Sequence, residues 1–238
     1  MKSEPKEAFP YKAPSKEILN KYPHLFKLKR PLPPRFIKAL FDKFIATILI
    51  FFSLPILGLL KLAYFIEGVL IPENEGPLFF YYYAVSEGRI FRKYKIRLIK
   101  KKYIDVKAAR KGDWIAYAAE WNKDSRTYVG KIAKKFYLDE IPQFFSVLKG
   151  ETSIVGPRSL SVMHYERDLA QGNISRKFLK AGMLGLGHIN KGTLEMGNPI
   201  YEYEYLDCYI KNSAFKLLCL DLWIIWRGFL LILKGGGF

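Results

Sequence analysis

Residues 44 to 60 of the sequence read FIATILIFFSLPILGLL and decide the fold. This stretch of 17 residues carries no charge and is at the lower limit of length for a helix that crosses a bilayer. Pro55 lies near its middle, where a proline removes a backbone hydrogen bond and kinks or breaks a helix. The hydroxyl of Ser53 is near enough to satisfy a backbone group freed by the proline. The stretch therefore predicts a membrane helix that is broken at Ser53 and Pro55.

Basic residues flank this apolar stretch on both sides. Lys38 and Lys43 precede it, and Lys61 follows it. Because positive charge favours the cytosolic side of a membrane, both ends are expected to face the cytosol. We therefore predict a re-entrant helix over residues 36–70. One alternative is a plain transmembrane helix that tolerates the proline. A buried helix of a soluble protein is less favoured, because the stretch is apolar on every side.

The segments before and after residues 36–70 differ in composition. Residues 1–35 are rich in lysine and proline and follow neither a helical nor a strand period. We expect an irregular basic arm that lies on an anionic surface. Residues 71–238 are long enough to bury one sizeable core. We expect them to form a cytosolic domain that rests on the membrane.

Residues 76–103 alternate apolar or aromatic residues with charged ones, as in RIFRKYKIRLIK. A turn signal is present at Glu87 and Gly88, so this segment predicts a β-hairpin. Eight basic residues and no acidic residue lie between Arg89 and Lys102. A run of like charge is usually a solvated face, and most of these side chains are expected to be solvated.

Two carboxylates, Asp139 and Glu140, stand side by side in the sequence LDEIPQFFSVLKG, which begins at Leu138. An apolar stripe with helical spacing follows them and consists of Ile141, Phe144, Phe145 and Leu148. Pro142 is tolerated only in the first turn of a helix, so the helix is expected to begin near Asp139. The positive end of the helix dipole would then help to keep the acids ionised.

The remaining sequence predicts mostly helical structure. Residues 151–160 suggest a short strand and a tight loop, and residues 161–170 suggest a helix. Residues 181–192, AGMLGLGHINKG, form a glycine-dense loop without the features of a P-loop. Residues 213–238 are apolar but interrupted by charges, which favours an interfacial helix over a spanning one, with a core-packed helix as the alternative. The predicted class is α/β in a loose sense, mostly helical with a small β-hairpin.

Charge and cysteine content limit the class of protein. The chain contains 39 Lys and Arg against 22 Asp and Glu, a formal net charge of +17. This balance predicts an anionic partner, such as nucleic acid, acidic lipid or a phosphorylated small molecule. The cysteines, Cys208 and Cys219, fit neither a zinc site nor a disulfide framework, which favours a reducing, cytosol-facing environment.

The stretch LDEIPQFFSVLKGETSIVGPRS, residues 138–159, is similar to the signature of the bacterial sugar transferases. These are the monotopic polyprenol-phosphate phosphoglycosyl transferases, and the typical signature is SLDELPQxxNVLKGxMSLVGPRP. Both acids, the following proline and glutamine, the Leu-Lys-Gly triplet and the Val-Gly-Pro-Arg run stay in register. Asp42 and Pro55 keep the spacing of the family's N-terminal KRxxD motif and Ser-Pro helix break. The resemblance extends over residues 36–237.

The chain departs from the family's pattern at several positions. Residues 181–192 stand where the family has PGxTGWAQVNGR and lack its proline, threonine, tryptophan and glutamine. Phe136 and Tyr137 replace the Thr-Ser pair before the acids, and Ser159 replaces the last proline of the signature. These departures lie where specificity for the sugar donor or the acceptor would reside.

The resemblance implies a reaction. A phosphosugar passes from a UDP-sugar to polyprenol (undecaprenyl) phosphate with release of UMP, as the first step of cell-surface glycan assembly. It also implies a covalent aspartyl-phosphosugar intermediate, with Asp139 as the nucleophile and Glu140 as its partner in positioning or proton handling. Mg²⁺ held by these two acids would offset the charge of the diphosphate. The implied location is the bacterial cytoplasmic (inner) membrane, with the catalytic domain facing the cytosol.

Several residues are candidates for binding the substrate. Arg158 is expected to clamp a phosphate with two hydrogen bonds. Lys95 and Arg97 of the hairpin are weaker candidates, and Gln143 follows the acid pair. We expect a UDP-sugar, a polyprenol phosphate and membrane phospholipids as partners. The sequence leaves open whether the chain forms a homodimer.

Two other functions explain part of the sequence. A non-catalytic, membrane-attached relative that scaffolds glycan assembly would explain the altered glycine-dense loop. Nucleic-acid binding would explain the charge and the aromatic residues of the hairpin, but not the proline-broken apolar stretch. We therefore expect no nucleic-acid partner.

Overall fold

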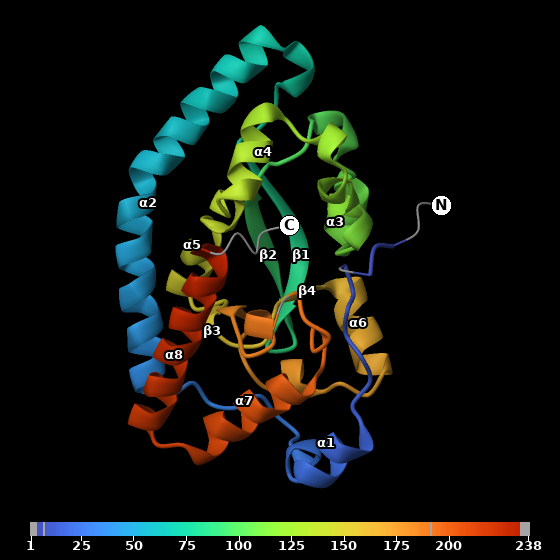
Figure 1. The fold of residues 1–238 in the computed structure, drawn as a ribbon, viewed down its shortest axis with the longest axis vertical. Coiled ribbons are helices and arrows are strands. Elements are labelled where there is room, and N and C mark those ends of the chain that lie inside the picture. Colours follow the sequence, from blue (N-terminus) through green and yellow to red (C-terminus); the bar gives the residue numbers. More distant parts are fainter. Residues whose placement is uncertain (1–3, 7, 191, 234–238) are drawn as a thin grey trace.

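Helices surround two small sheets in this protein, with the long helix α2 along one side (Figure 1). The computed structural model describes residues 4–6, 8–190 and 192–233. The chain is mostly helical, as the sequence predicts. Helices α7 and α1 lie at one end of the molecule, and helices α3 and α6 lie across the sheets from α2 (Figure 1).

Helix α2 covers Phe36–Leu70 and contains Pro55. It bends near its middle (Figure 1). Its most apolar window has a mean hydropathy of 2.3 and is only 17% buried, so α2 is long and apolar enough to cross a membrane. The expected break at Ser53 and Pro55 is thus a bend in a continuous helix. A proline removes one backbone hydrogen bond, and the neighbouring turns keep theirs.

The predicted hairpin is present. Strands β1 (Phe79–Ser86) and β2 (Arg89–Ile96) pair antiparallel. Glu87 and Gly88 between them have φ of 53° and 72°, the left-handed conformation that a two-residue hairpin turn requires. Strand β4 (Leu160–Ser161) pairs with the other edge of β1 and completes a sheet of order β2-β1-β4.

A second sheet joins the signature stretch to the glycine-dense loop. Strand β3 (Ser153–Val155) pairs parallel with β5 (Gly182–Leu184). A Cβ atom on Gly156 would lie 2.5 Å from the carbonyl oxygen of Lys180, and one on Gly182 would lie 2.0 Å from the backbone nitrogen of Gly156. Only glycine permits this approach, which fixes the loop that follows β3.

Short helices connect the strands. Those around the hairpin are α3 (Val106–Lys111), α4 (Tyr128–Lys135) and α5 (Gln143–Leu148). Residues Trp114–Trp121, predicted as a short helix, form a 3-10 helix. Helix α6 (Val162–Ala170) follows β4, where the sequence predicts a helix.

Two helices form the C-terminal part, α7 (Ile200–Lys211) and α8 (Ala214–Leu233). Leu217 and Ile224 of α8 are fully buried. The opposite side of α8 exposes large apolar side chains: Phe215, Leu222, Trp223, Trp226 and Phe229. One face therefore packs on the core as the alternative predicts, and the exposed face is apolar, as an interfacial helix requires.

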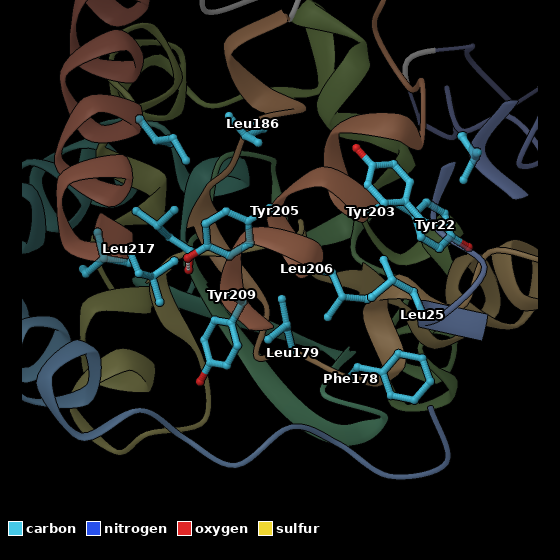
Figure 2. Close-up of a cluster of buried hydrophobic side chains, with 14 of the residues drawn as sticks. Tyr22, Leu25, Phe178, Leu179, Leu186, Tyr203, Tyr205, Leu206, Tyr209 and Leu217 are labelled. Atoms are coloured by element: carbon cyan, nitrogen blue, oxygen red, sulfur yellow. Dashed lines mark hydrogen bonds between the residues drawn. The ribbon is translucent and has the colours of Figure 1, made fainter. Parts of the chain in front are cut away.

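The N-terminal arm contributes to the main core. Helix α1 spans Lys16–Lys21, and Ile18, Tyr22 and Leu25 are buried. Figure 2 shows Tyr22 and Leu25 beside Tyr203, Leu206 and Phe178. The prediction of an irregular arm is therefore wrong for this part of the chain, because its apolar residues recur at helical spacing and find a core to pack against.

Candidate active site

Strand β2 and Arg97, the residue directly after its end, direct three basic side chains to one side of the sheet. Lys93, Lys95 and Arg97 are separated by two residues each and are all buried. Residues two apart on a strand point the same way, so the three share a face. Helix α5 and the 3-10 turn η6 (Leu138–Glu140) pack on this strand. The fold thus brings one predicted base, Lys95, to the predicted acids.

The two acids lie in the turn η6 and not in an α-helix. Tyr137 has φ of 55°, which turns the chain immediately before Asp139 and Glu140. Pro142 then caps α5, which begins at Gln143 and has six residues. The predicted helix start at Asp139 is wrong. A helix of six residues adds little to the positive electrostatic potential at the acids. The nearby lysines supply that potential.

Lys95 is the centre of the acid cluster. Its Nζ lies 2.9 Å from Asp139 Oδ2 and 3.6 Å from Glu140 Oε1. It also lies 3.3 Å from Glu120 Oε2. Burial alone would lower the pKa of Lys95, but these carboxylates raise it well above its ordinary value. The ammonium group therefore stays charged, and it holds Asp139 by charge.

Asp139 is completely buried, yet neither of its carboxylate oxygens accepts a hydrogen bond from any residue that the structure describes. Buried carboxylates are normally hydrogen-bonded, so unsatisfied oxygens mark a site with another purpose. The Glu140 side chain is 32% exposed and shows the side from which a ligand reaches the pair.

Glu140 is ionised. Burial alone would raise its pKa, but Lys95, Lys93, Lys134 and Arg158 lower it to about 2. At neutral pH this carboxyl group has no proton to donate. Its electrostatics therefore suit positioning and metal binding better than general acid catalysis.

Arg158 lies in the loop between β3 and β4, near enough to Glu140 for its charge to lower the pKa of that carboxyl group. Its carbonyl accepts a hydrogen bond from Arg176 Nε at 3.2 Å, and its backbone bridges to Gly182. Its side chain is exposed and forms no hydrogen bond or ion pair within the described part of the chain. A fixed backbone with a free guanidinium group is suited to binding a phosphate.

The sequence prediction missed two basic or acidic members of this cluster. Lys93 Nζ lies 3.0 Å from Ser159 Oγ, and burial lowers the pKa of Lys93 to about 8. Glu120 reaches Lys95 from the 3-10 helix at Trp114–Trp121. The two-residue spacing along β2 could have identified Lys93. Nothing local to Glu120 signals its role.

Two predicted substrate ligands have different surroundings. The guanidinium group of Arg97 donates to the carbonyls of Asn74, Pro77 and Ile99, at 2.8 to 2.9 Å. The structure therefore does not bring Arg97 to the acid cluster, because its donors are used in holding loops together. Gln143 is buried, and its Nε2 has no hydrogen-bond partner among the described residues, so it remains available to a ligand.

The acids fit a magnesium ion only in company with a substrate. No group of three or more His, Cys, Asp or Glu that could hold a metal exists among residues 4–6, 8–190 and 192–233. Magnesium is often bound by one or two carboxylates and by substrate phosphates. The unsatisfied oxygens of Asp139 and the ionised carboxyl of Glu140 are hard ligands of this kind.

Fold and site together show a buried acid pair among basic side chains, in a chain with one long apolar helix. Comparison with known families agrees. The chain belongs to the bacterial sugar transferase family, whose profile matches residues 33–235.

Curated relatives carry related names. The chain is 32% identical over 193 residues to a UDP-N-acetylgalactosamine-undecaprenyl-phosphate N-acetylgalactosaminephosphotransferase of Aeromonas hydrophila, covering 78% of this chain and 42% of that one. It is 29% identical over 210 residues to a UDP-glucose:undecaprenyl-phosphate glucose-1-phosphate transferase of Escherichia coli, covering 84% and 40%. A protein of the same name from Klebsiella pneumoniae is 43% identical over 116 residues, covering 46% and 23%. The chain thus matches less than half the length of these relatives.

Proposed function

We propose that this chain transfers a sugar phosphate from a UDP-sugar to undecaprenyl phosphate, releases UMP and so initiates assembly of a cell-surface glycan. One observation carries the proposal. The buried carboxylate of Asp139 is held by Lys95, and among the described residues neither of its oxygens accepts a hydrogen bond. The positive charge of Arg158, whose side chain is exposed, acts on the adjacent Glu140. The names of the relatives supply the substrate class.

The reaction takes two steps at phosphorus. An oxygen of Asp139 attacks the β-phosphorus of the donor, the bond to the bridging oxygen breaks, and UMP leaves with that oxygen and its electron pair. A phosphate oxygen of undecaprenyl phosphate then attacks the same phosphorus. The bond to Asp139 breaks, the carboxylate is regenerated, and undecaprenyl diphosphosugar is released.

The basic residues make this attack by an anion on an anion possible. The charged ammonium group of Lys95 holds the Asp139 carboxyl group in place. Lys93 and Arg158 add positive charge on the side of Glu140, where the diphosphate would lie. Magnesium, held by Asp139, Glu140 and the diphosphate, would supply further neutralisation of the phosphate charge.

We further propose that α2 enters and leaves the membrane on the cytosolic side. Both of its ends attach to the same folded domain. Near the start, Lys38 Nζ lies 2.7 Å from Asp221 Oδ2 of α8, and Ser153 Oγ donates to Asp42 Oδ2 at 2.7 Å. Near the end, Glu67 accepts hydrogen bonds from the first two backbone N–H groups of α4. A helix tied at both ends to one domain favours re-entry over a full crossing.

The exposed surface of α2 supports this placement. Its outward side chains are large and apolar: Phe44, Phe51, Phe52, Leu59, Leu62 and Phe65. Such a surface is stable in lipid. This apolar surface and the predicted cytosolic position of both ends support our proposal that the catalytic domain rests on the phospholipids of the bacterial inner membrane and faces the cytosol.

A donor screen tests the activity. The purified protein is incubated with undecaprenyl phosphate, Mg²⁺ and a panel of UDP-sugars, and UMP release is measured. We expect release with at least one donor and none after the Asp139→Asn substitution. Silence across the panel from a folded wild-type protein would favour a scaffolding role. Release by Asp139→Asn at the wild-type rate would exclude the covalent mechanism.

Accessibility labelling tests the topology. Cys208 and Cys219 are replaced by serine, and single cysteines are introduced at Phe36 and Leu70, the two ends of α2. A membrane-impermeant thiol reagent should label both positions in inverted membrane vesicles and neither in intact spheroplasts. Labelling of one position from each side would show that α2 spans the membrane.

A further inference from the structure

The N-terminal arm lies outside the family match, which begins at residue 33. Its first described part, residues 4–6 and 8–15, runs past α6 to α1 (Figure 1). This segment is attached at several points. Glu4 Oε1 lies 2.5 Å from His164 Nε2, and Glu4 Oε2 lies 2.7 Å from Arg167 Nη1. Farther along, the backbone N–H of Lys12 donates to the carbonyl of Gly197 at 3.1 Å.

The loop after β5 is shaped to receive the arm. Gly197 has φ of 79°, and a Cβ atom there would lie 2.0 Å from the carbonyl oxygen of Pro10. Any other residue would push the arm away. The arm is therefore held at a defined distance from the loop, and it is not a loose tail.

The arm closes one side of a pocket at the predicted phosphate ligand. Pro10 and Tyr11 line this pocket together with Arg158, His188 and Tyr201. His188 stands in the glycine-dense loop, where the family motif has its glutamine. Two walls of the pocket thus come from parts of the chain that differ from the family pattern: the arm and the altered loop.

Tyr11 is held rigidly with its hydroxyl free. The guanidinium group of Arg176 lies over its ring, 4.3 Å from the centroid. Arg176 is itself fixed by ion pairs with Asp168 and Glu202. The Tyr11 hydroxyl forms no hydrogen bond with the residues described, so it can serve a ligand.

We propose that the arm completes the donor-binding pocket of this chain and that Tyr11 and His188 bind the nucleotide sugar whose diphosphate Arg158 holds. The inference rests on the proposed transferase function. Aromatic and imidazole rings offer stacking surfaces to a base or a sugar, and a phenol and an imidazole offer hydrogen bonds. The chemistry of the pocket thus suits the organic parts of a nucleotide sugar, next to the cation that suits its phosphates.

Steady-state kinetics test this proposal. In a two-step transfer, kcat/KM for the donor reports only the step that releases UMP, whereas kcat/KM for undecaprenyl phosphate reports the second step. We expect Tyr11→Ala to lower kcat/KM for the donor about tenfold, the typical effect of losing a stacked ring, and to leave that for the acceptor within about twofold. His188→Gln should change the ratio of kcat/KM between UDP-glucose and UDP-N-acetylgalactosamine.

A matched control uses Tyr103→Ala, because Tyr103 is an exposed tyrosine that does not line the pocket. It should behave as wild type. Unchanged donor kinetics in Tyr11→Ala would overturn the proposal, as would an equal loss for donor and acceptor, which indicates a general structural effect.

A binding measurement separates this inference from the proposed activity. UDP-glucose and UDP are each titrated calorimetrically into the Asp139→Asn protein, with and without Tyr11→Ala. Weaker binding of both ligands places Tyr11 at the nucleotide, and weaker binding of UDP-glucose alone places it at the sugar. If no donor is turned over by the wild type, the proposed activity fails, while weaker binding in Tyr11→Ala still supports the pocket. If Tyr11→Ala changes the affinity for neither ligand, the proposed pocket is overturned.

Discussion

Two buried clusters in this protein contain the same chemical groups and differ in how completely they are satisfied. Around Lys38, Asp221 Oδ1 accepts from the Tyr205 hydroxyl at 2.7 Å, and Asp221 Oδ2 lies 2.7 Å from Lys38 Nζ. Asp42 in the same cluster accepts from Ser153 Oγ and from a backbone N–H. Around Lys95, by contrast, Asp139 has charge contacts with Lys95 and Lys134 but accepts no hydrogen bond from the residues that the structure describes.

This difference separates a carboxylate that stabilises the fold from a carboxylate that serves the reaction. In Asp221 and Asp42 both carboxylate oxygens have a polar partner, and these contacts join α2, α7, α8 and β3. An unsaturated carboxylate of equal burial raises the free energy of the folded state, and it is retained where chemistry needs its oxygens. The lysine cluster alone therefore does not identify the site; the missing hydrogen bonds do.

The largest effect is expected for Asp139→Asn, which tests whether Asp139 serves the reaction and not the stability of the fold. We expect kcat for UMP release to fall about 10³-fold or more, because the nucleophile is lost. The free energy of unfolding should change by only about 1 kcal/mol or less, because no hydrogen bond is removed and Lys95 keeps two other carboxylates. Activity assays and denaturant unfolding in detergent measure the two effects. A large loss of stability would show that Asp139 is structural.

The reverse pattern is expected for Asp221→Ala. This change removes the nearer carboxylate from Lys38 and the shorter hydrogen bond from the Tyr205 hydroxyl, and it should lower the free energy of unfolding by about 3–5 kcal/mol. The folded fraction should keep the wild-type KM for the donor, because Asp221 lies outside the acid cluster. Loss of donor affinity without loss of stability would contradict the assignment.

A smaller effect distinguishes Arg97 from Lys95, two basic residues at the end of β2. Arg97→Lys removes hydrogen bonds to three loop carbonyls and should lower the free energy of unfolding by about 1–3 kcal/mol, with donor KM unchanged. Lys95→Arg keeps the charge but alters its geometry, so it should reduce kcat and leave stability near wild type. If Arg97→Lys raised donor KM while stability stayed constant, Arg97 would be a substrate ligand after all.

The smallest effect is a pH dependence. The pKa of Lys93 is lowered to about 8, so this lysine loses its charge as the pH rises through 8. We expect kcat/KM for the donor to decrease above pH 8, and Lys93→Arg to remove the decrease. For stability the sign is opposite. An unfolded chain keeps Lys93 protonated up to about pH 10.4, so between these values unfolding takes up a proton and the contribution of Lys93 to stability rises with pH. A pH-rate profile identical in Lys93→Arg would exclude this role.

Local pattern was sufficient for some of the fold and the site. The hairpin turn needed two residues with positive φ, and Glu87-Gly88 provided them. The acid pair was found because adjacent carboxylates in a basic chain are unusual and because the surrounding signature matches a family. In these cases the deciding interactions lie within a few residues of each other.

Contacts between distant segments decided the rest. Arg97 and Lys95 are indistinguishable by pattern, since they stand two residues apart at the end of β2. Only the packing of neighbouring segments places Arg97 against backbone carbonyls and Lys95 against carboxylates.

The sequence by itself determined an apolar helix with a proline, a basic hairpin and a pair of acids, because composition and short-range spacing encode these. Only the tertiary structure decided which lysine faces the acids, that Asp139 is left unsatisfied, and that an arm beginning more than a hundred residues before Arg158 lines a pocket beside it. Hydrogen-bond saturation depends on every group that folding brings within about 3 Å, and no local pattern records those groups.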